Sequence, residues 1–239
     1  MFVSRKFFIF MAVAALALSA LTGVASAQRR SGEQGQAKVK GPINIAILIQ
    51  DDLVSQVSNE IGVTADFIRS LPQGSRVMVG YITTGSLQVR QPFTTDLNGA
   101  ARSLRIPIAS TSASPYNPYV EVIEALRTFD SGAKGRNAIL LVSDGLDVSR
   151  GFDSTSAGHT LDLERAIREA NNRNVAIYSF YAPAVGLTSH NRLAASYGQS
   201  SLNRVSNETG GRAFFQGLTG FVTFDSYFKQ LREALNQVY

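Results

Sequence analysis

Acidic residues follow two apolar segments that lie far apart in the chain. Asp51 and Asp52 come directly after the apolar residues 43–50, and Asp144 directly follows the apolar residues 137–143. Carboxylates that converge from distant parts of a chain form the oxygen-rich sites that Mg²⁺ and Ca²⁺ require. Asp51 and Asp144 could alternatively carry out acid and base chemistry together. Either chemistry requires a fold that brings the two segments side by side.

The spacing of apolar segments indicates such a fold. Segments typical of strands are residues 43–50, 76–83, 86–93, 137–143, 175–181 and 212–216. Thr84 and Gly85 form a hairpin signal, whereas the other gaps hold helical patterns long enough to cross over a sheet. Segments such as IAILI and AILLV are apolar on both faces, as in strands covered on both sides. We therefore predict an α/β fold: a doubly wound, mostly parallel, six-stranded sheet with one antiparallel edge strand and helices on both faces.

Helical patterns occupy residues 59–71, 96–104, 118–129, 161–173, 202–209 and 224–238. Thr95 is a candidate N-cap for the second helix, and Pro118 suits the first turn of the third. Gly210 and Gly211 can end the fifth helix with a positive φ. In a doubly wound sheet, ligands bind at the carboxyl ends of the strands, where the winding direction reverses. The acids would meet there if residues 43–50 and 137–143 form neighbouring strands.

The sequence resembles the von Willebrand factor A (VWFA) family, in particular its bacterial exported branch. The resemblance covers residues 43–239 and rests on four features in this order. They are the apolar strand that ends at Asp51, LLVSDGLD at residues 140–147, SLNRVSNETGGRAFF at residues 201–215, and the closing segment FDSYFKQLREALNQVY. The resemblance implies the same doubly wound, Rossmann-like sheet and a role in binding.

The family carries a metal-ion-dependent adhesion site, built from an Asp-x-Ser-x-Ser stretch, a Thr in a middle loop and a late Asp. Matched residue by residue, the resemblance assigns Asp51, Ser55 and Asp144 as ligands of Mg²⁺ or Ca²⁺. Leu53 stands at the position of the first Ser, and its isobutyl group offers no oxygen to an ion that prefers six oxygen ligands. Further candidate ligands are Asp52, Thr111 and Ser114. The resemblance therefore implies a degenerate site.

The same residues also have a purely structural interpretation. Asp51, Asp52 and Ser55 could cap or turn the chain into the first helix, and Asp144 could bond to the backbone of its own turn. No cofactor other than the ion is assigned. Both interpretations can hold together.

The sequence lacks the motifs of other common catalytic and nucleotide-binding sites. The chain contains no Gly-x-Ser-x-Gly, no phosphate-binding loop of the P-loop type and no Gly-x-Gly-x-x-Gly after a strand. His159 and His190 stand in polar segments and are expected to be exposed, as are Arg102 and Arg150. We therefore expect a binding module and not an enzyme. The alternative is a metal-dependent hydrolase that acts on phosphate or similar esters through Asp51 and Asp144.

Composition and loops indicate the kind of partner. The net charge is +5, and two of the positive charges, Arg5 and Lys6, lie in an N-terminal leader. This balance gives no basic patch for nucleic acid, so a protein or glycan partner is expected. Residues 147–160, with Phe152, and residues 182–199, with Leu187, Leu193 and Tyr197, are predicted loops that could recognise it.

The leader and its sequel set the predicted boundaries. Residues 1–27 have a basic start, an apolar run and the cleavage site Ala25-Ser26-Ala27, which is typical of a signal peptide. An uncleaved membrane anchor is the alternative, because the run approaches the length that spans a bilayer. Residues 28–42 are a predicted flexible linker, and residues 43–239 a single VWFA-like domain. The mature chain, which has no cysteine, is expected to be secreted or periplasmic and not inserted in a membrane.

Overall fold

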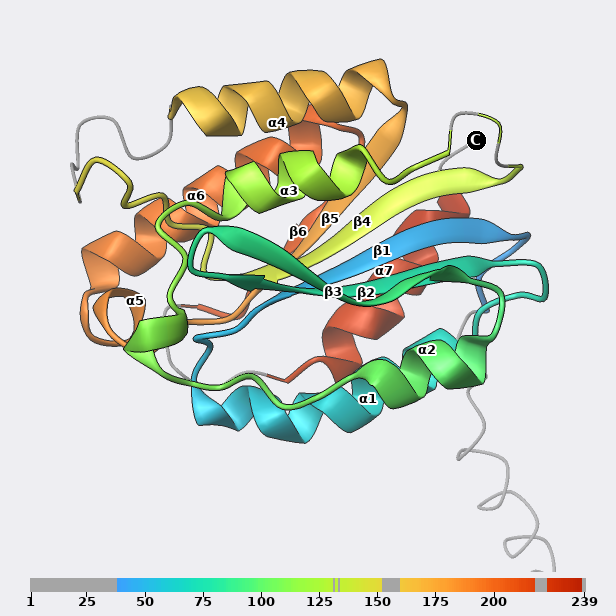
Figure 1. The fold of residues 1–239 in the computed structure, drawn as a ribbon, viewed down its shortest axis with the longest axis horizontal. Helices are drawn as coiled ribbons and strands as arrows, with labels where there is room; N and C mark the ends of the chain where they lie inside the picture. The colour runs from blue at the N-terminus through green and yellow to red at the C-terminus, as the bar shows by residue number, and fades with distance from the viewer. Residues whose placement is uncertain (1–37, 131, 133, 152–159, 218–222, 238–239) are drawn as a thin grey trace, which may run out of the picture. The chain divides into compact units, whose positions relative to one another are not determined.

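The computed structural model describes residues 38–130, 132, 134–151, 160–217 and 223–237 (Figure 1). The predicted signal peptide, most of the predicted linker and most of the predicted loop 147–160, including Phe152 and His159, lie outside these residues. None of the helices described is both long and apolar enough to cross a membrane.

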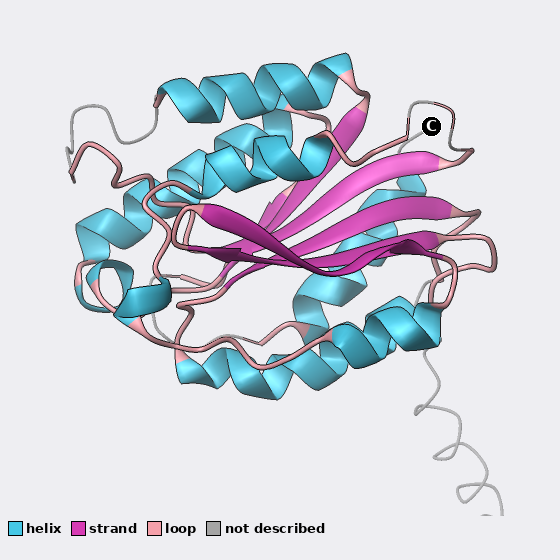
Figure 2. Ribbon diagram, viewed as in Figure 1, coloured by secondary structure: helices cyan, strands magenta, loops and turns pink. Residues whose placement is uncertain are grey.

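Six strands form one sheet whose order explains the position of the acids. The strands are β1 (Ile43–Gln50), β2 (Arg76–Thr83), β3 (Ser86–Thr94), β4 (Arg136–Ser143), β5 (Val175–Tyr181) and β6 (Ala213–Phe214). They lie in the order β3-β2-β1-β4-β5-β6, and every neighbouring pair is parallel except the antiparallel pair β2 and β3 (Figure 2). The predicted mostly parallel sheet with one antiparallel edge strand is confirmed.

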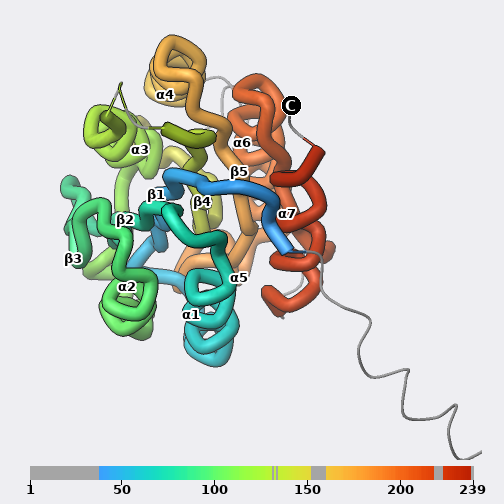
Figure 3. The backbone as a smooth tube through the Cα atoms, turned by 90° about the vertical axis from the view of Figure 1, so that its right-hand side faces the viewer, coloured from blue at the N-terminus to red at the C-terminus, as the bar shows by residue number. Residues whose placement is uncertain are grey.

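Helices cover both faces of this sheet (Figure 3). The helices are α1 (Glu60–Arg69), α2 (Leu97–Ser103), α3 (Pro118–Leu126), α4 (Leu161–Asn172), α5 (Leu187–His190), α6 (Arg192–Glu208) and α7 (Asp225–Gln237), with two 3₁₀ turns, η1 (Ser55–Asn59) and η2 (Thr111–Ala113). Buried side chains of α1, α2 and α7 form one apolar core with the sheet, and those of α3, α4 and α6 form the other.

The central strand β1 shows why the sequence folds in this way. All eight of its residues are buried. Because successive side chains of a strand point to opposite faces, Ile47 and Ile49 enter the core beneath α1 and α7, whereas Ala46 and Leu48 enter the other core. A strand that is apolar on both faces can lie only in the middle of such a sandwich.

The prediction that residues 182–199 form a loop is wrong over most of this segment. Residues 187–190 form α5, and α6 begins at Arg192 rather than at residue 202. The side chain of Asn191 accepts hydrogen bonds from the amides of Leu193 and Ala194, and so caps α6. The serines and Gly198 in this segment lower its intrinsic helix propensity, which is why the pattern resembled a loop.

Two helix ends test the predicted capping residues. Asp96, not Thr95, caps α2, because its carboxylate accepts the amide of Gly99 at 2.8 Å. A carboxylate at this position satisfies an amide that has no partner within the helix. Gly210 has a φ of 78° just after α6, which confirms the predicted glycine stop.

Candidate functional site

The carboxyl ends of β1 and β4 lie side by side at one edge of the sheet. The register pairs Ile49 with Val142, so Asp51 and Asp144 follow the two strands at the same level. We call this edge the rim, and define it as residues 51–59, 105–117, 144–151 and 182–193. Strands β1 and β4 are therefore neighbours, which is the condition that the sequence set for the two acidic turns to share one edge.

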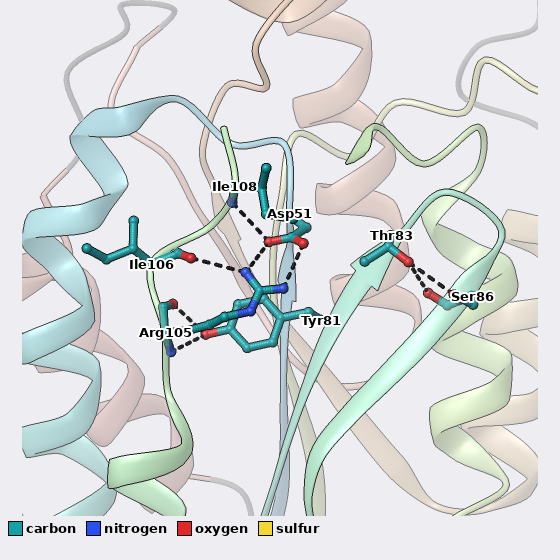
Figure 4. Close-up of polar contacts among 7 residues, drawn as sticks. All are labelled: Asp51, Tyr81, Thr83, Ser86, Arg105, Ile106 and Ile108. Atoms are coloured by element: carbon teal, nitrogen blue, oxygen red, sulfur yellow. Dashed lines mark hydrogen bonds and ion pairs between the residues drawn. The ribbon is translucent and has the colours of Figure 1, made fainter. Parts of the chain in front are cut away.

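Asp51 is completely buried and is bound by an arginine (Figure 4). The two terminal nitrogens of Arg105 donate to the two carboxylate oxygens, at 2.5 Å to Oδ1 and 2.7 Å to Oδ2. The amide of Ile108 also donates to Oδ1, at 3.1 Å. Two parallel charge-assisted hydrogen bonds are among the stronger pairings that a protein offers to a carboxylate. Both oxygens of Asp51 are therefore already engaged.

Arg105 is held in turn by Tyr81 of β2. Its guanidinium carbon lies 4.0 Å from the centre of the Tyr81 ring, within the range of a cation–π contact. The Tyr81 hydroxyl donates to the carbonyl of Arg105 at 2.6 Å and accepts from its amide at 2.8 Å (Figure 4). The hydrogen bond to Asp51 raises the pKa of Arg105 and outweighs the opposing effect of burial. Arg105 is thus charged and fixed at both its backbone and its side chain.

Asp144 lies in a turn with neutral partners. Its Oδ1 accepts the amide of Leu146 at 3.1 Å, and its Oδ2 accepts the hydroxyl of Thr188 at 2.9 Å. Burial raises the pKa of Asp144 to about 7, and the negative charge of Asp52 adds to this rise. The bond to Leu146 confirms that Asp144 bonds to the backbone of its own turn.

Asp52, and not Asp51, is the acid that belongs with Asp144. The two are linked through Gln50, whose Nε2 donates to Asp52 at 2.7 Å and whose Oε1 accepts from the Asp144 amide at 3.3 Å. Asp52 Oδ2 has no hydrogen-bond partner within the described part of the chain. Burial raises the pKa of Asp52, although the nearby Ser114 and Gln50 side chains favour its charged form. Asp51 is separated from this pair, because its carboxylate is bound by Arg105 and by the amide of Ile108.

Of the remaining predicted ligands, Ser55 and Thr111 lie in the 3₁₀ turns η1 and η2, whereas the Ser114 side chain lies near Asp52. Ser55 is exposed at the start of η1, where it lines an open cavity of about 510 Å³ together with Val54, Ala109 and His190. Thr111 begins η2, and Ser114 follows it, with its carbonyl accepting the hydroxyl of Thr84. No side-chain cap is made at η1 or α1, so Asp51, Asp52 and Ser55 do not act as helix caps, although Asp51 and Asp52 do lie in a turn that leads to η1.

These residues do not fit a metal-ion-dependent adhesion site. Asp51 is bound by Arg105, and Leu53, fully buried, pairs with Ala184 of the segment after β5 and supplies no oxygen. In the described residues, no three His, Asp or Glu side chains are grouped as a metal ion would need. The assignment of Asp51, Ser55 and Asp144 as ligands of Mg²⁺ or Ca²⁺ stays a prediction, which this geometry does not favour. The geometry does not favour the hydrolase alternative either.

Three residues that bind the buried acids were not predicted from the sequence: Arg105, Gln50 and Thr188. Gln50 gave a signal, because it is a polar residue at the end of a largely apolar strand that is covered on both faces. Arg105 gave a weaker one, as a charge inside the apolar stretch LRIPI. His190 is exposed as expected, and so are Arg102 and Arg150.

Comparisons with solved structures identify the fold. No model of a protein family matches this sequence, and no curated protein does. An aerotolerance-related membrane protein from Bacteroides fragilis, crystallised with multiple mutations to serines, is similar at a TM-score of 0.56 and 14% identity over 83% of this chain and 100% of that one. The conserved hypothetical protein BatB from Bacteroides thetaiotaomicron is similar at 0.55 and 14%, over 82% and 97%.

A von Willebrand factor type A protein from Catenulispora acidiphila is similar at a TM-score of 0.56 and 15% identity, over 82% of this chain and 43% of that one. At such identities the likeness concerns the fold alone. The chain therefore has a VWFA-like fold, as the sequence motifs indicated.

Proposed function

We propose that this chain is an exported binding module of the VWFA type that contacts a protein partner through its rim. The observation that carries the proposal is a set of large apolar side chains exposed on the rim: Ile106, Ile108, Tyr116, Leu187 and Leu193. Export rests on the predicted signal peptide. A glycan partner would favour polar and aromatic surface, whereas aliphatic side chains favour a protein.

The most exposed aliphatic pair lies on one short extended segment. Ile106 and Ile108 are each 60% exposed, while the intervening Pro107 is buried. Because Pro107 is buried between them, both exposed isoleucines lie on the solvent side of this segment and can contribute to one apolar surface. Exposed apolar side chains that are scattered singly need no explanation, but neighbouring ones are typical of interaction sites.

A second rim element lies close to this segment. Ala109 and Val185, the latter just before α5, line the same cavity of about 510 Å³. A Cβ on Gly186 would lie 3.6 Å from the Thr111 side chain, so the start of α5 contacts η2. A partner that inserts an apolar side chain into the cavity would contact both elements at once, which is how interface anchors bind.

The polar groups of the rim support binding rather than catalysis. Asp51 is engaged by Arg105, and Asp144 by Leu146 and Thr188. A catalytic acid or base must reach its substrate within hydrogen-bonding distance, and these carboxylates are buried behind their own partners.

Affinity capture from the cell envelope tests the proposal. The full chain is immobilised as wild type, as Ile106→Glu/Ile108→Glu, and as the matched control Val89→Glu, which changes an exposed aliphatic residue on the edge strand β3. We expect a partner that the wild type and the control retain and the rim variant loses. Equal retention by all three proteins would contradict the proposal.

A further inference from the structure

Arg105 stands where the resemblance to the VWFA family would place a divalent ion. We infer that Arg105 is a built-in counter-ion of the rim, which compensates Asp51 and fixes residues 105–109 across the end of β1 without any metal. This positioning role concerns how the rim is held together. It therefore stands or falls independently of whether the rim binds a protein partner.

The first support is the complete use of the Asp51 carboxylate. Arg105 occupies both oxygens, and the Ile108 amide takes a further position on Oδ1. The Asp51 side chain has no exposed surface, and that of Arg105 is 25% exposed. A divalent ion would have to displace the guanidinium from a largely dehydrated site, where ion pairs are least screened.

The second support is that Arg105 is preorganised. Tyr81 stacks on the guanidinium and clamps the backbone of Arg105 with two hydrogen bonds. The nitrogen that bonds Asp51 Oδ1 also donates to the carbonyl of Ile106, at 3.1 Å. A planar guanidinium that is held from several sides loses little conformational entropy when it pairs with a carboxylate. A lysine in the same place would lose more, because its flexible side chain lacks the planar group.

The third support is the central place of Asp51 among the backbone contacts of the rim. Its amide donates to the carbonyl of Ile82 in β2, and its carbonyl accepts the amide of Ala109. Ala109 has a φ of 53°, a left-handed backbone conformation that residues other than glycine rarely adopt. The surrounding contacts must stabilise this conformation. The pair of Asp51 and Arg105 thus joins β1, β2 and the segment that displays Ile106 and Ile108.

Thermal melting with and without metal tests the counter-ion role. The full-length wild type and Asp51→Asn are melted in EDTA and in about 5 mM Mg²⁺, Ca²⁺ or Mn²⁺. An ion bound far above its dissociation constant raises Tm by several degrees. We expect the metal-induced change in Tm to be the same in both proteins. A rise of several degrees in the wild type that Asp51→Asn lacks would overturn the inference.

Hydrogen exchange tests the positioning role. In Arg105→Met, the amides of Ile108 and Ala109 should exchange about tenfold faster or more than in the wild type, whereas the Gly99 amide, bonded to Asp96, should not change. Arg105→Lys keeps the charge without the planar fork and should recover part of the protection, so it also serves if the methionine variant does not fold. Unchanged exchange at Ile108 and Ala109 in both variants would overturn the inference.

Discussion

The rim accommodates its buried carboxylates in two opposite ways. We call the surroundings of Asp51, after β1, the first half of the rim, and the surroundings of Asp144, after β4, the second half. Asp51, after β1, is paired with the charged Arg105. Asp144, after β4, receives only the neutral donors of Leu146 and Thr188, and the nearby Asp52 adds a second negative charge. A buried carboxylate must be paired with a cation or take up a proton. The first half uses an ion pair, whereas in the second half burial raises the pKa of Asp144 and so favours its protonated form.

This difference gives the second half a dependence on pH. The pKa of Asp144 in the folded chain, about 7, lies above its ordinary value of 3.8. A raised pKa means that the folded state binds the proton more tightly than the unfolded state does. The resulting stability is fully present below about pH 3.8 and is lost as the pH rises through 7. The second half should therefore weaken between pH 5 and pH 8.

The largest expected loss of stability comes from a substitution that disturbs only the second half of the rim. A Cβ on Gly198 of α6 would collide with the carbonyl oxygen of Asp144. We expect Gly198→Ala to lower the free energy of unfolding by about 3 kcal/mol, because backbone atoms cannot give way as a flexible side chain can. Gly62→Ala is the matched control, since it places a Cβ in open space on α1 and should stabilise the helix by about 0.5 kcal/mol or more. Equal urea midpoints for the two variants would contradict this.

Exchanging each acid for its amide compares the two halves directly. Asp51→Asn should cost about 2 kcal/mol at pH 8, because it leaves the partly buried Arg105 without its partner. Asp144→Asn should cost less, since it removes a charge that burial disfavours, and its stability relative to the wild type should rise between pH 5 and pH 8. Urea unfolding at both pH values measures this. The comparison fails if Asp144→Asn is the more damaging change at pH 8.

A third buried acid extends the comparison beyond the rim. Glu121 of α3 is buried, its Oε2 has no partner among the described residues, and burial raises its pKa to about 7 from 4.5. Its stability contribution is present below about pH 4.5 and lost as the pH rises through 7. Glu121→Gln should therefore gain about 1 kcal/mol over the wild type between pH 5 and pH 8. Glu124→Gln, on the exposed side of α3, should show little change, and the same gain in both would refute this explanation.

The smallest effect contrasts the buried ion pair with one at the surface. Arg69 and Asp66 of α1 are 2.8 Å apart, and both side chains are exposed. Asp66→Asn should change the free energy of unfolding by less than about 0.5 kcal/mol, and salt should abolish the difference. A cost comparable with that of Asp51→Asn would remove burial as the reason for the importance of the Asp51 pair.

The sheet could be predicted well from the sequence, because each strand is recognisable from its own apolar residues. The bounds of β1, β2 and β5 agree with the predicted ones, since each is a short and mostly apolar run. The apolar pattern left the adjacency of β1 and β4 as a condition, and the structure supplies it and with it the position of the rim. The start of α6 was missed because Gly198 and its neighbouring serines mask a helix that packs closely on the Asp144 turn.

The chemistry of the rim was harder to predict. Which of Asp51 and Asp52 faces Asp144 depends on where the alternation of β1 ends, a matter of one residue. The partner of Asp51 depends on the path of residues 104–110, an irregular segment with no periodic pattern. Arg105 lies 54 positions from Asp51 in the chain, so only the folded structure joins them.

A double-mutant cycle on Asp51 and Arg105 tests the central claim most directly. Urea unfolding of the wild type, Asp51→Asn, Arg105→Met and the double variant yields the coupling energy between the two side chains. If Arg105 is the counter-ion of Asp51, the coupling energy should be about 2 kcal/mol, and the double variant should lose far less than the sum of the single losses. Additive losses, with a coupling energy near zero, would contradict the account.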